Sequence, residues 1–219
     1  MKRYIRSSAR VRASSELHSA STKAVYNTEQ RMGIKDEIDT SIYDDPAYDY
    51  WQTRQIRLGL KSGVDVNVYA DPKYDELQME EIRKGLETGL DVSVYANPEY
   101  DYHQMFEIRK GLEEGLDFSI YANPAYSDSQ MWQIRLGLES GLDVSIYADP
   151  KYTNGQMEEI REGLEAGLDV YVYSDPAYDD YQMEQIRLGL ESGVDARVYA
   201  DPSYDYEQME EIREDLEFL

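Results

Sequence analysis

Apolar residues first recur at helical spacing along this chain and then alternate with polar residues. In residues 69–94, the apolar positions at i, i+3, i+7 and i+11 are Met79, Ile82, Leu86 and Leu90. This spacing places them on one stripe of an amphipathic helix, with charged residues on the other sides. The pattern therefore predicts a helix that ends near residue 88.

The predicted helix has a clear start and a clear end. Asp75 and Gln78 form the two halves of a capping box, in which each side chain satisfies a free backbone amide of the first turn. The same pairing recurs at Asp49/Gln52, Asp101/Gln104, Ser127/Gln130, Thr153/Gln156, Asp179/Gln182 and Asp205/Gln208. Gly89 stands where a left-handed residue ends a helix. Gly85 lies inside the helix at a cost of about 1 kcal/mol, which we interpret as the close passage of a neighbouring helix.

The segment after the helix allows two readings. Leu90, Val92, Val94 and Ala96 alternate with polar residues, as in a strand. Alternatively, Asp91 caps a short helical turn. The strand reading gives an α/β solenoid, but the asparagine ladder of leucine-rich repeats is missing. We favour alternating long and short helices and keep the strand as the alternative.

These signals repeat with a fixed period of 26 residues. The period is marked by every proline of the chain: Pro46, Pro72, Pro98, Pro124, Pro150, Pro176 and Pro202. Such a period is typical of a solenoid, in which each unit buries its apolar face against its neighbours. We predict an all-α solenoid of eight tandem units, capped at both ends. The single repeat domain spans 20–219: a degenerate cap repeat at 20–42, repeats at 43–198 and a C-terminal cap unit at 199–219. Residues 1–19 form a basic, flexible N-terminal arm.

Charge is the second distinctive property of the chain. The sequence has 45 Asp and Glu against 22 Lys and Arg, a net charge of −23, although residues 1–35 hold eight basic and two acidic residues. The acidic solenoid should repel nucleic acid and anionic membranes and attract basic surfaces. There is no cysteine, and we find no membrane span or export signal. We expect a cytoplasmic protein in a bacterial host cell.

Residues that could carry chemistry are few. One arginine and one aspartate recur in each unit, as at Arg83 and Asp91, and we interpret them as ladders that tie adjacent units together. His18 and His103 have no partner at metal-ligand or catalytic spacing. No phosphate loop or nucleophile motif is present. The sequence therefore predicts a protein that is not an enzyme, with no metal site, cofactor or small-molecule substrate.

The repeat resembles a known class. The pattern Q-M-x-x-I-R-x-G-L-E-x-G-L-D-V-S-x-Y-A-x-P-x-Y, read at residues 130–152, is similar to repeats carried by phage, plasmid and conjugative-element proteins of gut Firmicutes. The similarity covers about residues 30–219. It implies a mobile-element origin and an all-helical fold, and it transfers no catalytic residue. This chain departs from the usual pattern in consisting of repeats alone, with acidic variable positions.

The variable positions are the candidate binding residues. The predicted acidic face, on the solvent side of the helices, comprises Glu80, Glu81, Glu87, Glu107, Glu113, Glu114, Glu158, Glu159, Glu162, Glu165, Glu207, Glu210, Glu211 and Glu214. Candidate interface aromatics are Tyr50, Tyr102, Tyr171, Tyr181 and Tyr206. The basic arm contributes Lys2, Arg3, Arg6, Arg10 and Arg12.

Rows of carboxylates on stacked helices can imitate a nucleic-acid backbone. Our leading hypothesis is an acidic nucleic-acid mimic from a mobile element, of the anti-restriction or anti-CRISPR type. It would occupy the basic channel of a host defence enzyme that binds nucleic acid. The alternative is a general protein–protein interaction scaffold whose acidity serves solubility.

Overall fold

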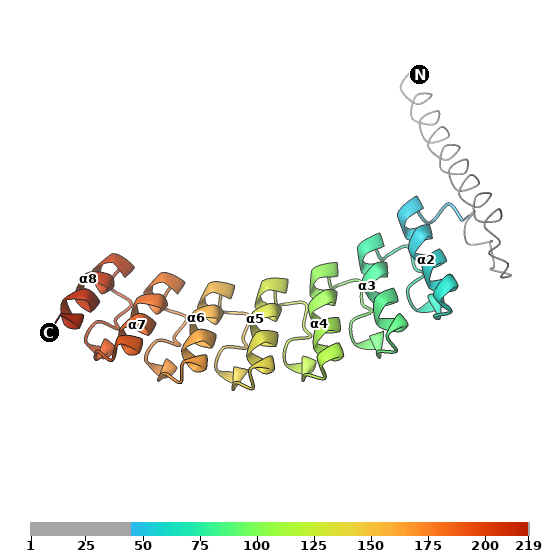
Figure 1. The fold of residues 1–219 in the computed structure, drawn as a ribbon. Helices are drawn as coiled ribbons and strands as arrows, with labels where there is room; N and C mark the ends of the chain where they lie inside the picture. Colours follow the sequence, from blue (N-terminus) through green and yellow to red (C-terminus); the bar gives the residue numbers. More distant parts are fainter. Residues whose placement is uncertain (1–44, 219) are drawn as a thin grey trace, which may run out of the picture. The chain divides into compact units, whose positions relative to one another are not determined.

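The computed structural model describes residues 45–218, in which long α-helices alternate with short 3-10 turns (Figure 1). The helices are α2 (Tyr50–Ser62), α3 (Glu76–Glu87), α4 (Tyr102–Glu114), α5 (Asp128–Glu139), α6 (Asn154–Glu165), α7 (Asp180–Ser192) and α8 (Tyr206–Glu217). The turns are η2 (Val66–Val68), η3 (Val92–Val94), η4 (Phe118–Ile120), η5 (Val144–Ile146), η6 (Val170–Val172) and η7 (Ala196–Val198). No strand occurs among these residues.

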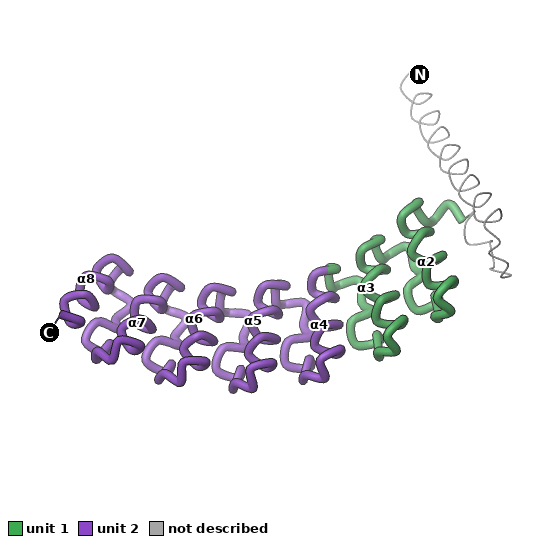
Figure 2. Tube along the Cα trace, viewed as in Figure 1, with its two compact units in different colours: residues 1–102 green, residues 103–219 purple. Residues whose placement is uncertain are grey.

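The chain divides into two compact units, residues 1–102 and 103–219 (Figure 2). In the first, α2 packs on α3; in the second, α5, α6, α7 and α8 pack each on the next. Packing between sequential neighbours is the arrangement of an α-solenoid, so the predicted all-helical fold is confirmed for this part of the chain. The strand alternative is not supported, because each alternating segment forms a 3-10 turn. The arm 1–19 and the repeat 20–42 lie outside the described residues, and the count of eight units with caps stays a prediction.

Helix ends follow the predicted capping chemistry. Both hydrogen bonds of the capping box are present at the starts of α2, α3, α5, α6, α7 and α8. After α3, Gly89 adopts a φ of +78°, which only glycine reaches without strain. Every turn but η6 is capped as well. In η3, Asp91 accepts hydrogen bonds from the backbone amide and the hydroxyl of Ser93. Each repeat is thus defined locally by its own sequence.

Each helix from α2 to α7 contains an internal glycine, and the close contact that requires it is not the predicted one. A Cβ on Gly111 would overlap the phenol oxygen of Tyr121, which follows turn η4 of the same repeat. The tyrosine ring is fully buried, and its hydroxyl donates a hydrogen bond to the helix carbonyl of Glu107 at 3.3 Å. The close neighbour is therefore a tyrosine folded back onto its own helix. The expectation of a neighbouring helix was wrong.

Polar side chains join one repeat to the next across a narrow core. In each helix from α2 to α7 a methionine or threonine and an isoleucine are buried near the middle of this core, as Met131 and Ile134 are in α5. Beside them, Gln130 Nε2 donates to the carbonyl of Pro150, 3.2 Å away in the loop before α6. The capping-box glutamine therefore has two roles, since its Oε1 accepts from the Ser127 amide while its Nε2 bonds the next repeat.

Candidate partner-binding surface

A ladder of arginines crosses the joints between helices. Arg135 on α5 is buried, and its Nε donates to Glu107 Oε2 on α4 at 2.8 Å. Its Nη1 reaches Glu114 Oε2 at 3.3 Å and also pairs with Glu139, four residues later on its own helix. One guanidinium therefore binds three carboxylates and holds two helices in register.

The ladder repeats with a spacing of 28 residues between acceptor and arginine. The other bonds of this type join Gln55 to Arg83, Gln133 to Arg161, Glu159 to Arg187 and Gln185 to Arg213. The prediction that these arginines tie repeats together is confirmed. The matching prediction for the aspartates is wrong for most of them, because Asp91, Asp117 and Asp143 cap their own turns. Asp169 alone among the described aspartates of this series has an ion pair to the next repeat, with Arg197 at 2.7 Å.

Three residues of the predicted acidic face are turned away from solvent. Glu81 and Glu107 are buried, and Glu159, with 15% of its side chain exposed, is bound to Arg187. All three are the sixth residue of their helix. The side chains of Glu107 and Glu159 bind an arginine of the following repeat instead of extending outward. Glutamine holds the same position in α2, α5 and α7. A strict choice between Glu and Gln is the sequence signal that could have identified a buried acceptor.

Burial changes the acidity of the ladder carboxylates. Desolvation raises the pKa of Glu107 above its ordinary value of 4.5, and the hydrogen bond and charge of Arg135 oppose that shift without cancelling it. The same balance with Arg187 raises the pKa of Glu159. A carboxyl group with a raised pKa in the folded state binds its proton more tightly there than in the unfolded chain. Its contribution to stability therefore declines as the pH rises from about 4.5 through the raised pKa.

Replacing Glu107 with glutamine should remove this pH-dependent loss. A glutamine at this position can accept from Arg135 Nε as Gln133 accepts from Arg161, at 2.8 Å. We expect the E107Q variant to be at least as stable as the wild type at pH 7 and to converge with it below about pH 4.5. Urea unfolding at a series of pH values measures this. A clear loss of stability at pH 7 would mean that the Glu107 charge is needed for the joint.

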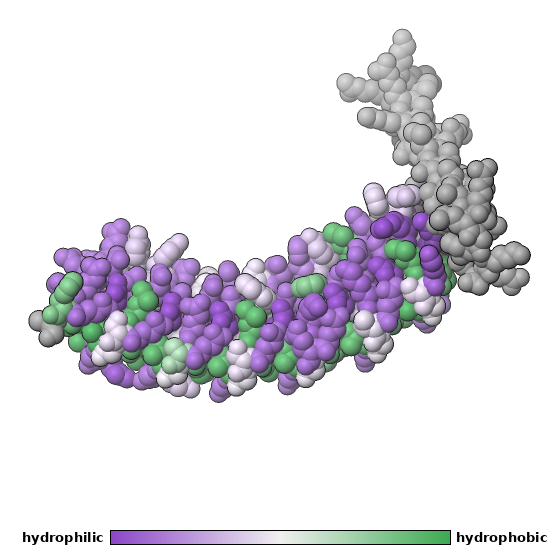
Figure 3. Space-filling view, viewed as in Figure 1, coloured by the Kyte–Doolittle hydropathy of each residue, from purple (hydrophilic) through white to green (hydrophobic). Residues whose placement is uncertain are grey.

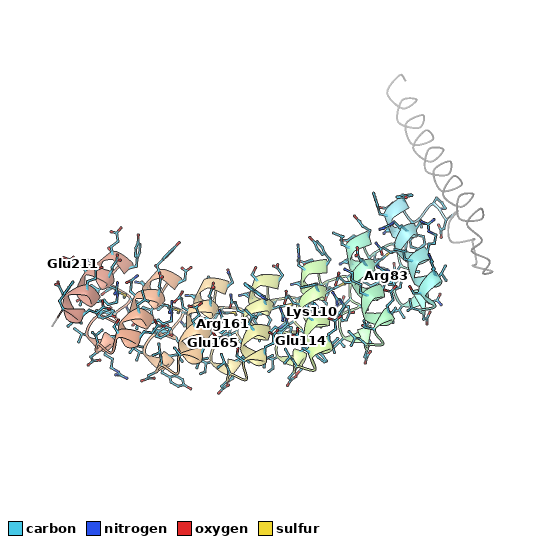
Figure 4. The ribbon with its side chains drawn as sticks, viewed as in Figure 1. Arg83, Lys110, Glu114, Arg161, Glu165 and Glu211 are labelled. Carbon is cyan, nitrogen blue, oxygen red and sulfur yellow. The ribbon has the colours of Figure 1, made fainter. Side chains whose placement is uncertain are left out.

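Several outward carboxylates are partly neutralised by the same arginines. Arg161 pairs with Glu165 at 2.8 Å on α6, where both are labelled in Figure 4. Arg187 Nη2 reaches Glu162 at 3.2 Å. Other ladder arginines form ion pairs with Glu87, Glu113 and Glu114, and Lys84 forms one with Glu80. These residues of the predicted face contribute less net charge to a partner than their number suggests.

The remaining predicted carboxylates lie on α6 and α8. Within residues 45–218, no cation forms an ion pair with Glu158, Glu207, Glu210, Glu211 or Glu214. Glu184 was not among the predicted residues, yet it holds on α7 the position that Glu158 holds on α6 and Glu210 on α8. We call Glu158, Glu184 and Glu210 the acidic row. Helices that pack directly are about 8–10 Å apart, so the row repeats a carboxylate at roughly that interval.

The same position carries aromatic residues on α4 and α5. Phe106 and Trp132 are 37% and 45% exposed, and Lys110 Nζ lies 5.9 Å from the Phe106 ring centroid. At this position, α4 and α5 thus carry an aromatic residue, whereas α6, α7 and α8 carry a glutamate. The space-filling view shows a mainly hydrophilic surface with separate apolar spots (Figure 3).

Of the predicted interface tyrosines, two lie together. The rings of Tyr181 and Tyr206 are 5.4 Å apart between centroids, at the starts of α7 and α8. Tyr171, on η6, is 76% exposed. In the other compact unit, Tyr50 packs edge-on against Trp51 at 5.1 Å, and Tyr102 is half-buried. The five basic residues of the predicted arm lie outside the described residues.

Other kinds of site find little support in the described part of the chain. No three metal-binding side chains gather there, and none of its helices is both long and apolar enough to span a membrane. The chain matches no known protein-family model, no curated protein and no solved structure. The acidic row and the tyrosine pair beside it are the candidate functional surface.

Proposed function

We propose that this protein binds the basic nucleic-acid channel of a host enzyme through the acidic row of α6, α7 and α8. The observation that carries the proposal is that Glu158, Glu184 and Glu210 stand in one register on consecutive helices, with no ion pair to any residue of the described part of the chain. Glu158 and Glu184 are half-buried and Glu210 is exposed. Carboxylates at regular intervals attract a surface lined with Lys and Arg and speed encounter with it. The tyrosine pair adds contact area at low entropy cost.

The setting proposed for this activity is a mobile element, because of the resemblance of the repeat pattern. The protein would then act as an inhibitor of the anti-restriction or anti-CRISPR type, displacing nucleic acid by charge mimicry. It would not bind duplex DNA through the solenoid, since both carry negative charge. The mechanism needs no catalytic group, cofactor or metal. Binding alone blocks the channel.

A charge variant with a matched control tests the proposal. The triple variant E158Q/E184Q/E210Q removes three charges from the acidic row. The control D91N/D117N/D143N removes three charges from the turns, and asparagine keeps the capping acceptor at each position. In pull-downs from a bacterial host lysate at low salt, we expect the first variant to lose a nucleic-acid-binding protein by about tenfold. The control should retain it.

Two results would count against nucleic-acid mimicry. One is that no basic nucleic-acid-binding protein is retained by the wild type even at low salt. The other is equal capture by both variants. Capture that survives high salt and is lost when Phe106 and Trp132 are replaced by serine would favour the second candidate, a general interaction scaffold. The exposed aromatic residues on α4 and α5 are the observation that supports this candidate.

A further inference from the structure

The joints within the stack share hydrogen bonds from the capping-box glutamine and from the ladder arginine, and some joints add a bond from a tyrosine hydroxyl. Around α6, Gln156 Nε2 donates to the carbonyl of Pro176 at 3.3 Å, and Glu159 accepts from Arg187 Nε at 2.7 Å. The hydroxyl of Tyr152 donates to a backbone carbonyl 22 residues later, at 2.7 Å. Three side chains of one repeat thus recognise two carbonyls and one arginine of the next.

Helix α8 keeps the same three side chains without these partners. Tyr204, Gln208 and Glu211 stand in the register of Tyr152, Gln156 and Glu159. Tyr204 is 37% exposed, whereas its counterparts in the other repeats are 4–8% exposed. Gln208 and Glu211 are exposed too, and Figure 4 labels Glu211 at the outer end of this stack. No described residue binds the Tyr204 hydroxyl, Gln208 Nε2 or the Glu211 carboxylate. We call this surface the α8 end face.

The chain itself contains a segment that fits the α8 end face by register and charge. In a joint, the accepting carbonyl at Pro176 and the arginine at Arg187 are 11 residues apart, and Ala20 and Arg31 have the same separation in the sequence. Residues 1–35 hold eight basic and two acidic residues, whereas α8 holds six acidic residues and one arginine. Charge complementarity therefore favours this pairing. Two α8 end faces would instead place Glu211 against Glu211.

We propose that the α8 end face binds residues 20–35 of a second copy of this chain, with Arg31 of that copy taking the ladder position on Glu211. The contact is head-to-tail, so the two surfaces involved differ and further copies can add at either end. This association uses Tyr204, Gln208 and Glu211 and none of the three residues of the acidic row. It gives the protein a way to extend its repeats by assembly.

A charge swap in the full-length chain tests the contact. Sedimentation velocity over a concentration series should show a weight-average mass that rises steadily above that of the monomer. E211R and R31E should each weaken association at least tenfold, because each sets like charges against each other. The double variant E211R/R31E should restore association. E99R, the same charge change at an exposed residue of the loop before α4, should leave it within about twofold of wild type.

Several outcomes would overturn the proposal. A wild type that stays monomeric at every concentration excludes the contact. A closed dimer that E211R does not affect would place the interface elsewhere. Equal effects of E99R and E211R would reduce the association to net charge. Two disruptive single variants with no restoration in the double variant would exclude the Glu211–Arg31 pair. Circular dichroism of each variant checks that the helices remain folded.

Discussion

Replacing Gly111 with alanine is expected to destabilise the compact unit formed by residues 103–219 by about 1–3 kcal/mol. In an ordinary helix interior the same exchange is stabilising by about 1 kcal/mol. Here the sign reverses, because the added methyl group would overlap the phenol oxygen of Tyr121. Tyr121 is fully buried and has nowhere to move without opening the turn that carries it.

Removing the phenol oxygen should relieve this clash. The Y121F variant alone loses its hydrogen bond to the Glu107 carbonyl and should cost about 0.5–1.5 kcal/mol. The double variant G111A/Y121F should therefore be more stable than the sum of the two single losses implies. Gly115 provides the control: it has a φ of +71° and open space where a Cβ would stand, so G115A is strained whether or not residue 121 carries a hydroxyl.

Urea unfolding followed by circular dichroism measures these variants and the wild type. Additive losses for G111A and Y121F would contradict the assignment of the helix glycine to the tyrosine. Rescue of G115A by Y121F would contradict it as well, since the space beside Gly115 is open and the tyrosine does not fill it.

Replacing Arg135 with methionine should be the most damaging change in the arginine ladder. Methionine keeps much of the length of the side chain but leaves the buried carboxylate of Glu107 without its cation. Removing one partner of a buried ion pair typically costs about 3–5 kcal/mol. The raised pKa of Glu107, caused first by burial, indicates that this carboxylate is poorly solvated even with Arg135 in place.

Arg161 is the matched control, because its buried acceptor is the neutral Gln133. The R161M variant loses the hydrogen bond to Gln133 and the ion pair with the exposed Glu165, but it leaves no buried charge. We therefore expect a loss of about 1–3 kcal/mol. Adding E107Q to R135M should recover part of the larger loss. Equal losses for R135M and R161M in urea unfolding at pH 7 would mean that the charge on Glu107 is not what makes its joint sensitive.

Local features of the fold could be predicted from the sequence because short-range chemistry determines them. The capping box at Asp75 and Gln78 and the left-handed Gly89 each depend on residues within one helix, and both are present as predicted. The 3-10 turn was harder to predict, since the alternation of Val92 and Val94 also suits a strand. The hydrogen bond from the Ser93 amide to the Asp91 side chain favours the turn over the strand, and the alternation of apolar residues does not reveal this bond.

Features that depend on the direction of a side chain were also harder to predict. Glu81 and Glu107 are charged and lie off the apolar stripe, so the pattern placed them in solvent. In the structure both are buried, and Glu107 faces the next repeat. The glycine at position 85 pointed correctly to a close contact but not to Tyr95, ten residues later, as its source. Both errors concern which neighbour a residue meets, which a periodic pattern leaves open.

The most direct test of the proposed function is competition with nucleic acid. A nucleic-acid-binding protein captured by the wild type should release a labelled duplex or RNA when this protein is added in equimolar amount at low salt. The E158Q/E184Q/E210Q variant should need about tenfold more protein for the same release, and D91N/D117N/D143N should act as the wild type does. Formation of a ternary complex, with the nucleic acid still bound, would contradict the claim that the acidic row of α6, α7 and α8 occupies the nucleic-acid channel.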